Sequence, residues 1–279
     1  MARVVFCHGI GHTYRHREDI RESWYEALCR GMVDVGLQPL GYDEVAAVYY
    51  GNCFRSRSAK QVVAADEFSF LPNYGPRDLG SPLELELLEA FAGGVAEERG
   101  TKGLVQGALR RLESSRFLGD VPAKAVIWFI KQVHRYLTEE QLRDAVLARW
   151  DRVVTEETRV VVGHSLGSVV AYEALRAHPE WRIDTLVTLG SPLGLRAIYS
   201  RLRPPVAPGD VDAWPGVRRW VNVAAVEDPV SLVKKLSPIY GGGVEDTLVS
   251  NGRFAAHSVV RYLTTAEAVE GIADGLVRG

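Results

Sequence analysis

Short runs of β-branched apolar residues alternate with longer segments of helical spacing along most of the chain, and this alternation narrows the possible folds most. Continuous apolar strands are typical of a parallel sheet that is buried on both faces, because helices connect its strands and cover it. The 279 residues are enough for one large domain. The sequence therefore predicts a single α/β domain over 1–279. The expected strands lie near 3–7, 44–50, 159–162, 185–189, 219–224 and 247–250, and the expected helices at 17–35, 138–153, 166–178 and 266–277.

The interval 52–137 breaks this alternation, because it has four prolines and no convincing strand. Its Leu-rich stretch 83–92 and its apolar stretch 125–130 indicate helices. We therefore predict a helical insertion within the domain. Its helices either pack on the main core or form a cap over an apolar pocket, since long segments between core elements often carry function.

Charge and cysteine content exclude several classes of protein. The 33 basic and 35 acidic residues nearly balance, and no long run of one sign offers a surface for nucleic acid. Cys7, Cys29 and Cys53 lack paired spacing, so neither a disulfide framework nor a zinc ribbon is expected. No apolar stretch approaches the ~18 residues that cross a bilayer, and no leader precedes the first strand. We expect a cytoplasmic protein, and the oligomeric state stays open.

The strongest local motif is Gly163-His164-Ser165-Leu166-Gly167, which lies between an expected strand and an expected helix. A serine on such a sharp turn presents its hydroxyl outward, and glycines are needed where a side chain would strike neighbouring backbone. The helix N-terminus that follows directs its N–H groups and positive dipole end to the same point. We therefore predict that Ser165 is a nucleophile.

A serine hydroxyl needs a base that removes its proton and a carboxylate that orients the base. Asp228 follows an expected strand, and His257 comes later in the chain, which gives the order Ser, Asp, His. Glu227 is the rival acid. We favour Asp228 because Pro229 stiffens the turn that presents it, although Asp228 could instead cap a helix that begins at Pro229.

The loop after the first strand, His8-Gly9-Ile10-Gly11, has the position from which an oxyanion hole takes its second donor. We assign the two donors to the backbone N–H groups of Ile10 and of Leu166, the residue after the nucleophile. The alternative is an ordinary turn that ends a strand.

Together these motifs resemble the α/β-hydrolase superfamily, and in particular bacterial lipases and carboxylesterases with the pattern HG-X-G, G-H-S-X-G, D, H. The resemblance extends from the first strand to the last helix, and Gly190-Ser191-Pro192 is similar to the GSP turn of that group. It implies an α/β-hydrolase fold with about six mostly parallel strands flanked by helices, and a cap formed by the insertion. It also implies acyl transfer from an ester to water through an acyl-enzyme. The insertion has no counterpart that we can name.

A metal site is a different interpretation of the first loop, because His8, His12 and His16 recur at four-residue spacing and would share one face of a helix. Gly9 and Gly11 make that helix improbable, and no further ligand motif accompanies the histidines. We therefore expect no metal and no cofactor.

The type of reaction, and whether the protein turns over a substrate at all, remain open. The catalytic centre would serve an esterase or lipase, a thioesterase, or an acyltransferase, and a hydrolase-like fold can also bind without turnover. The Leu-rich insertion favours an apolar acyl group on a small-molecule ester or thioester, since burial of apolar surface stabilises binding. Arg55, Arg57 and Lys60 would attract an anionic substrate, or would simply be a solvated face.

Overall fold

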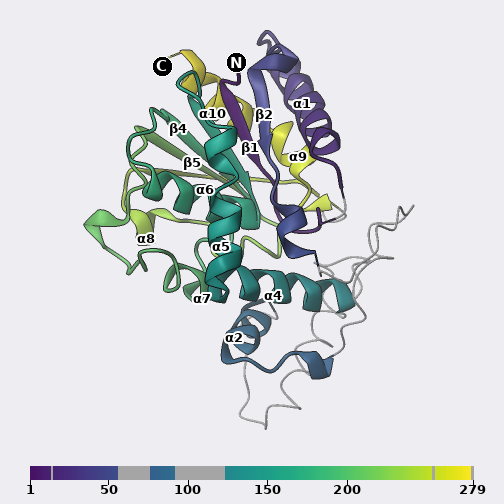
Figure 1. Cartoon of the computed structure of the whole chain (residues 1–279). Coiled ribbons are helices and arrows are strands. Elements are labelled where there is room, and N and C mark those ends of the chain that lie inside the picture. Colours follow the sequence, from purple (N-terminus) through teal and green to yellow (C-terminus); the bar gives the residue numbers. More distant parts are fainter. Residues whose placement is uncertain (14, 56–75, 92–122, 253–254, 278–279) are drawn as a thin grey trace.

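The fold is an α/β sandwich with one six-stranded sheet, in which every strand pair is parallel (Figure 1). The computed structural model describes residues 1–13, 15–55, 76–91, 123–252 and 255–277. The strand order is β2-β1-β3-β4-β5-β6. The α/β class and the six parallel strands predicted from the sequence are confirmed. The strands are β1 Val4–Cys7, β2 Val45–Val48, β3 Val160–His164, β4 Thr185–Leu189, β5 Arg219–Ala225 and β6 Val244–Val249.

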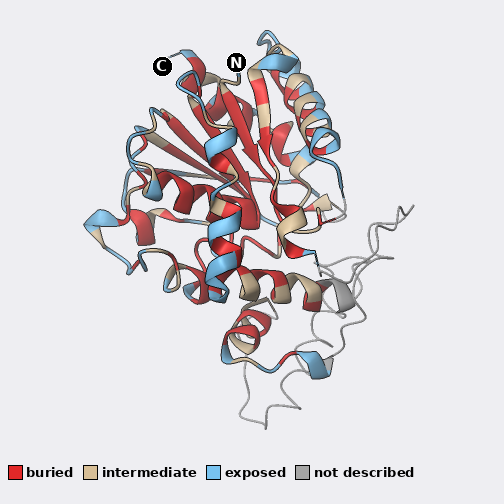
Figure 2. Cartoon of the chain, viewed as in Figure 1, coloured by how far each residue is buried: buried red, intermediate tan, exposed pale blue. Residues whose placement is uncertain are grey.

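The central strands bury side chains on both faces, as their continuous apolar sequence predicts (Figure 2). In β1, Val4 and Phe6 face the helices α1 and α10, whereas Val5 and Cys7 pack with α6 on the other face. This alternation follows from the two-residue period of a strand. Each face of the sheet therefore has its own apolar core.

Helices cover both faces of the sheet. One layer contains α1, α9 and α10, and the other contains α5 and α6 with α4 beside them (Figure 1). The helices of eight or more residues are α1 Arg17–Asp34, α2 Pro82–Phe91, α4 Ala123–Thr138, α5 Glu140–Leu147, α6 Leu166–Ala177 and α10 Ala266–Val277. The shorter ones are α7 Arg196–Tyr199, α8 Ser237–Tyr240 and α9 Val259–Leu263. None of the described helices combines the length and apolar character that a membrane span requires.

Two expected boundaries are wrong. The segment 138–153 is not one helix, because α4 ends at Thr138, α5 spans Glu140–Leu147 and a 3₁₀ turn follows at Trp150–Arg152. Glu139 between the two helices has extended backbone angles, which breaks the run. Strand β6 begins at Val244, before the expected start at 247, because residues 245–248 of this edge strand are exposed or only partly buried and so form no continuous apolar run.

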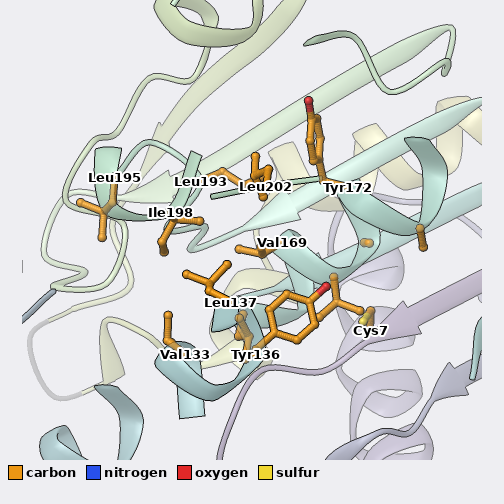
Figure 3. Close-up of a cluster of buried hydrophobic side chains, with 14 of the residues drawn as sticks. Cys7, Val133, Tyr136, Leu137, Val169, Tyr172, Leu193, Leu195, Ile198 and Leu202 are labelled. Carbon is orange, nitrogen blue, oxygen red and sulfur yellow. The ribbon is translucent and has the colours of Figure 1, made fainter. Parts of the chain in front are cut away.

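The described part of the insertion packs on the main core. Val133, Tyr136 and Leu137 of α4 lie against Val169 of α6 and Ile198 of α7 in one apolar cluster (Figure 3). Ionic and polar groups strengthen this contact, since the buried carboxylate of Glu173 in α6 accepts hydrogen bonds from Tyr136 and Arg143. Residues 56–75 and 92–122 lie outside the described chain, so the predicted cap over a pocket remains a prediction.

The strand order creates a switch point between β1 and β3. The chain leaves β1 toward β2 on one side and leaves β3 toward β4 on the other. The loops that follow β1 and β3 therefore diverge at the carboxyl edge of the sheet, where open α/β sheets bind ligands. His8–Gly11 and Ser165 follow these two strands.

Candidate active site

Ser165 joins β3 to α6 in a strained conformation. Its φ of 55° and ψ of −131° make it the only non-glycine residue in the described chain with a positive φ. Such strain persists only where the surroundings impose it, and it is concentrated at functional sites. Neighbouring glycines make the turn possible, because a Cβ on Gly167 would lie 2.1 Å from the Cys7 carbonyl oxygen and one on Gly163 would lie 2.6 Å from Ser168 Cα. This geometry is the sharp strand-to-helix turn that the motif predicts.

The Ser165 hydroxyl is buried and has no hydrogen-bond partner among the described residues. Most buried side-chain polar atoms are paired, so an orphaned hydroxyl requires an explanation. Gly9 lies directly against it, because a Cβ on Gly9 would be 2.7 Å from Ser165 Cβ and 3.2 Å from its Oγ. The loop after β1 therefore forms one wall around this hydroxyl.

His257 and Asp228 form a hydrogen-bonded pair beside the turn. His257 Nδ1 lies 2.8 Å from Asp228 Oδ2, and the aspartate is fully buried whereas the imidazole is partly exposed. The Val230 N–H donates to Asp228 Oδ1 at 2.8 Å, and Tyr262 Oη donates to Oδ2 at 2.6 Å. Burial raises the pKa of Asp228, but the positive charge of His257 and these hydrogen bonds outweigh it and bring the pKa below its usual value. Asp228 is therefore a charged carboxylate that orients an imidazole.

Glu227, the rival acid, points elsewhere. Its Oε1 accepts a hydrogen bond from Ser250 at 2.7 Å, and its pKa is lowered first by that bond. No helix begins at Pro229, and Asp228 instead closes a tight turn onto the N–H of Val230. Of the two carboxylates, Asp228 is the one in contact with His257.

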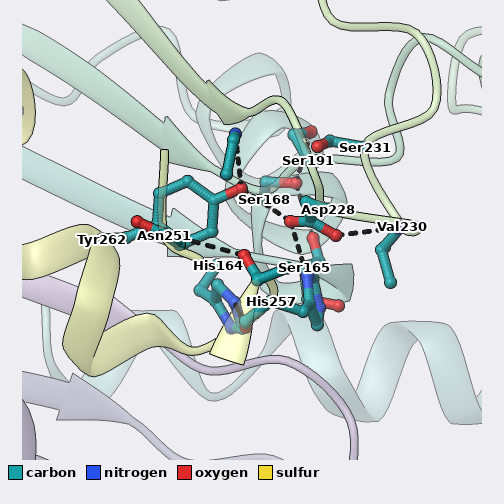
Figure 4. A network of polar contacts seen from close by, with 12 residues as sticks. His164, Ser165, Ser168, Ser191, Asp228, Val230, Ser231, Asn251, His257 and Tyr262 are labelled. Carbon is teal, nitrogen blue, oxygen red and sulfur yellow. Dashed lines mark hydrogen bonds and ion pairs between the residues drawn. The ribbon is translucent and has the colours of Figure 1, made fainter. Parts of the chain in front are cut away.

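Two contacts bring the acid–base pair to the serine turn. His164 Nε2 lies 2.9 Å from the His257 carbonyl oxygen, and their ring centroids are 4.5 Å apart. Gly190 lies against the pair, since its Cβ would be 2.6 Å from Asp228 Oδ2 and 3.1 Å from His257 Nδ1. Leu189, the residue before it, accepts a hydrogen bond from the Ser165 N–H at 3.1 Å. Ser165, His257 and Asp228 thus belong to one cluster (Figure 4), although the serine and histidine are not hydrogen-bonded, as is common without substrate.

The two predicted oxyanion donors belong to Leu166, which follows Ser165, and to Ile10, which follows Gly9. Leu166 is the first residue of α6, so its N–H has no partner within the helix. Ile10 follows Gly9, whose backbone abuts Ser165. In the described parts of the chain, neither N–H is hydrogen-bonded. Both groups are therefore available to an oxygen that carries developing charge.

The side chain of His8 stabilises this loop rather than the reacting atoms. Its Nδ1 donates to the Gly9 carbonyl at 2.6 Å, its Nε2 accepts from the Tyr50 N–H at 3.2 Å, and its ring stacks on Tyr50 at 4.2 Å. Burial lowers the pKa of His8 to about 4, only partly opposed by the bond to Gly9. His8 is therefore neutral near pH 7.

The three histidines considered for zinc do not share a helix face. His8 and His12 lie in irregular backbone and contact each other edge to face at 4.9 Å, whereas His16 is exposed before α1. No cluster of three or more ligating side chains suited to a metal occurs within the described residues.

Three side chains of the cluster were missed by sequence reasoning: Tyr262, Lys234 and the imidazole of His164. Lys234 Nζ donates to the carbonyl oxygens of Ala225 and Asp228 at 2.6 and 2.7 Å, which holds the loop that carries the acid. No motif marks Lys234 or Tyr262. His164 lies inside the serine motif, but the spacing does not show that its ring packs on His257.

Neither a scan against models of protein families nor a search of curated proteins found a match to this chain.

Proposed function

We propose that this protein is a serine hydrolase of the α/β-hydrolase type that cleaves a carboxylic ester through an acyl-enzyme. The observation that carries the proposal is the orphaned hydroxyl of Ser165 on a strained turn, in one cluster with His257 and the buried Asp228, which are hydrogen-bonded to each other. Strain and an unpaired polar atom both cost stability, so their coincidence favours a catalytic role. The parallel sheet and its switch point support the fold assignment.

In the proposed reaction, Ser165 Oγ attacks the ester carbonyl while His257 takes its proton at Nε2. Asp228 fixes the tautomer through Nδ1–H and stabilises the imidazolium that forms. The N–H groups of Ile10 and Leu166 donate to the tetrahedral oxyanion, and each such donor contributes about 10²- to 10³-fold in rate. His257 then protonates the leaving alcohol, and water releases the acyl group by the same steps.

An apolar acyl group is the favoured substrate portion. Leu166 and Leu193 flank the serine turn and the Gly190 turn, and both belong to the same apolar core cluster, against which Ile10 is packed. This cluster continues into α4, part of the proposed 52–137 cap (Figure 3). Apolar burial of an acyl chain contributes roughly 25 cal/mol per Å².

The test is hydrolysis of p-nitrophenyl esters of increasing acyl length, with acyl-CoA thioesters alongside. We expect kcat/KM to increase with chain length and to be lost in Ser165→Ala. Ser200→Ala removes an exposed hydroxyl that donates to the Arg196 carbonyl and accepts from Arg201, so it is the matched control and keeps full activity. Preference for acyl-CoA would point to a thioesterase or acyltransferase. Folded wild type that turns over neither class would favour a binding module.

A further inference from the structure

Tyr262 and His257 share one oxygen of the buried acid. Tyr262 Oη lies 2.6 Å and His257 Nδ1 lies 2.8 Å from Asp228 Oδ2 (Figure 4). The tyrosine is fully buried in α9, and its oxygen also accepts the N–H of Ala225 at 2.8 Å. Because that N–H points at the hydroxyl oxygen, the hydroxyl proton is directed to the carboxylate. The tyrosine therefore acts as a fixed donor.

We propose that Tyr262 is a positioning residue of the triad. Its hydroxyl holds Asp228 in place and withdraws negative charge from Oδ2. It therefore limits how strongly Asp228 stabilises the protonated form of His257. This inference rests on the proposed function, since it assigns a role within that site. A hydrogen bond to a carboxylate is about twice as strong as one between neutral groups, so the shared oxygen makes the two donors compete.

The tyrosine stays protonated across the working range. Burial, and then the negative charge of Asp228, raise its pKa far above that of a free tyrosine. Gly190 packs against this contact, because a Cβ at that position would be 2.6 Å from Asp228 Oδ2 and 3.0 Å from Tyr262 Cε2. The competition for Oδ2 is therefore built into the closed packing of the site.

The other ionisable groups around the pair act differently. Lys234 contacts the backbone oxygen of Asp228 rather than its carboxylate, and burial lowers the pKa of Lys234 even though Asp228 and Glu227 oppose this. Glu227 is bonded to Ser250. His164 packs on His257, but burial lowers its pKa to about 3, so it is neutral. Among these groups, only Tyr262 donates to the same oxygen as His257.

The experiment replaces Tyr262 by phenylalanine in the full chain. Without the hydroxyl, the charge of Asp228 concentrates on the bond to His257 and stabilises the imidazolium. We expect the acidic limb of the kcat/KM profile to move upward by about half to one pH unit, with a three- to tenfold loss of kcat/KM near pH 6. Tyr240→Phe is the matched control, because it removes a buried hydroxyl that bonds the Leu193 carbonyl and leaves the limb unchanged.

NMR titration of the His257 ring measures the same upward movement of the imidazole titration midpoint without turnover. The ring signals are assigned with a His257→Gln variant. If the wild type hydrolyses no ester but the titration midpoint moves, the proposed function fails and the role of Tyr262 stands. An unmoved midpoint in folded Tyr262→Phe overturns the inference, whatever the activity. If that variant does not fold, fluorotyrosine at position 262, a stronger donor of the same shape, should move the midpoint downward, and no movement overturns the inference.

Discussion

Gly9→Ala tests the contact between the loop after β1 and Ser165. The new methyl carbon would lie 2.7 Å from Ser165 Cβ, whereas contacting carbons are about 3.5 Å or more apart, so one of the two must shift by about 0.8 Å. The methyl carbon would also lie 3.3 Å from the His164 carbonyl oxygen, so it meets backbone as well as side chain. Overpacking of this kind costs about 1–3 kcal/mol of stability, and a misplacement near 1 Å costs about 10²-fold in rate.

The assay is kcat/KM for a short p-nitrophenyl ester, with urea unfolding to confirm that the variant is folded at the assay temperature. Gly80→Ala is the matched control, because a Cβ there meets nothing within 4 Å. We expect Gly9→Ala to lose about 10²-fold in kcat/KM and Gly80→Ala to lose nothing. A folded Gly9→Ala protein with wild-type kcat/KM would refute the placement of this loop against Ser165.

Three further predictions follow from strain, buried histidine and a buried ion pair. Ser165→Gly should abolish hydrolysis yet raise the free energy of unfolding by about 1 kcal/mol, because glycine tolerates the positive φ at this position. If urea titrations showed a less stable variant, Ser165 would not be strained in the wild type. Burial lowers the pKa of His8 to about 4, so the unfolded chain binds a proton that the folded protein excludes. The contribution of His8 to the free energy of unfolding is therefore fully present above pH 6.5, and about 3 kcal/mol of it is lost as the pH falls to 4. Urea titrations of the wild type and of His8→Gln at several pH values would give parallel profiles if His8 were not buried and neutral. Glu173→Gln leaves Arg143 buried beside a neutral partner and should lower the free energy of unfolding by about 3–5 kcal/mol. Glu139→Gln removes one partner of an exposed pair and should lower it by less than about 1 kcal/mol. Equal losses in urea titrations would argue against a buried ion pair at Glu173.

The sheet could be predicted where burial is complete on both faces. Strands β1, β3 and β4 are short runs of mostly apolar or β-branched residues, all of them buried, and such runs are typical of strands in a parallel sheet. At the edge, β6 exposes Glu245 and Leu248, and its first residues could not be distinguished from a loop. The break at Glu139 was also missed, because a single extended residue between two helices leaves the apolar spacing intact.

The site could be predicted in its residue types but not in its supporting contacts. The Ser165 motif carries its own local geometry, since the strand, the glycines and the helix all lie within a few residues. Asp228 and Glu227 are adjacent and chemically alike, so only the direction of the backbone decides which of them meets His257. The bond from Tyr262 depends on where α9 docks on the sheet, which no local pattern encodes.

The central claim is that Ser165 becomes acylated with His257 as its base. The most direct measurement is mass spectrometry of the full chain after reaction with a p-nitrophenyl ester quenched in acid, followed by mapping of the modified peptide. We predict an added acyl mass on Ser165 in the wild type and none in His257→Ala. Acylation at another residue, or equal labelling of Ser165 without the imidazole, would contradict it.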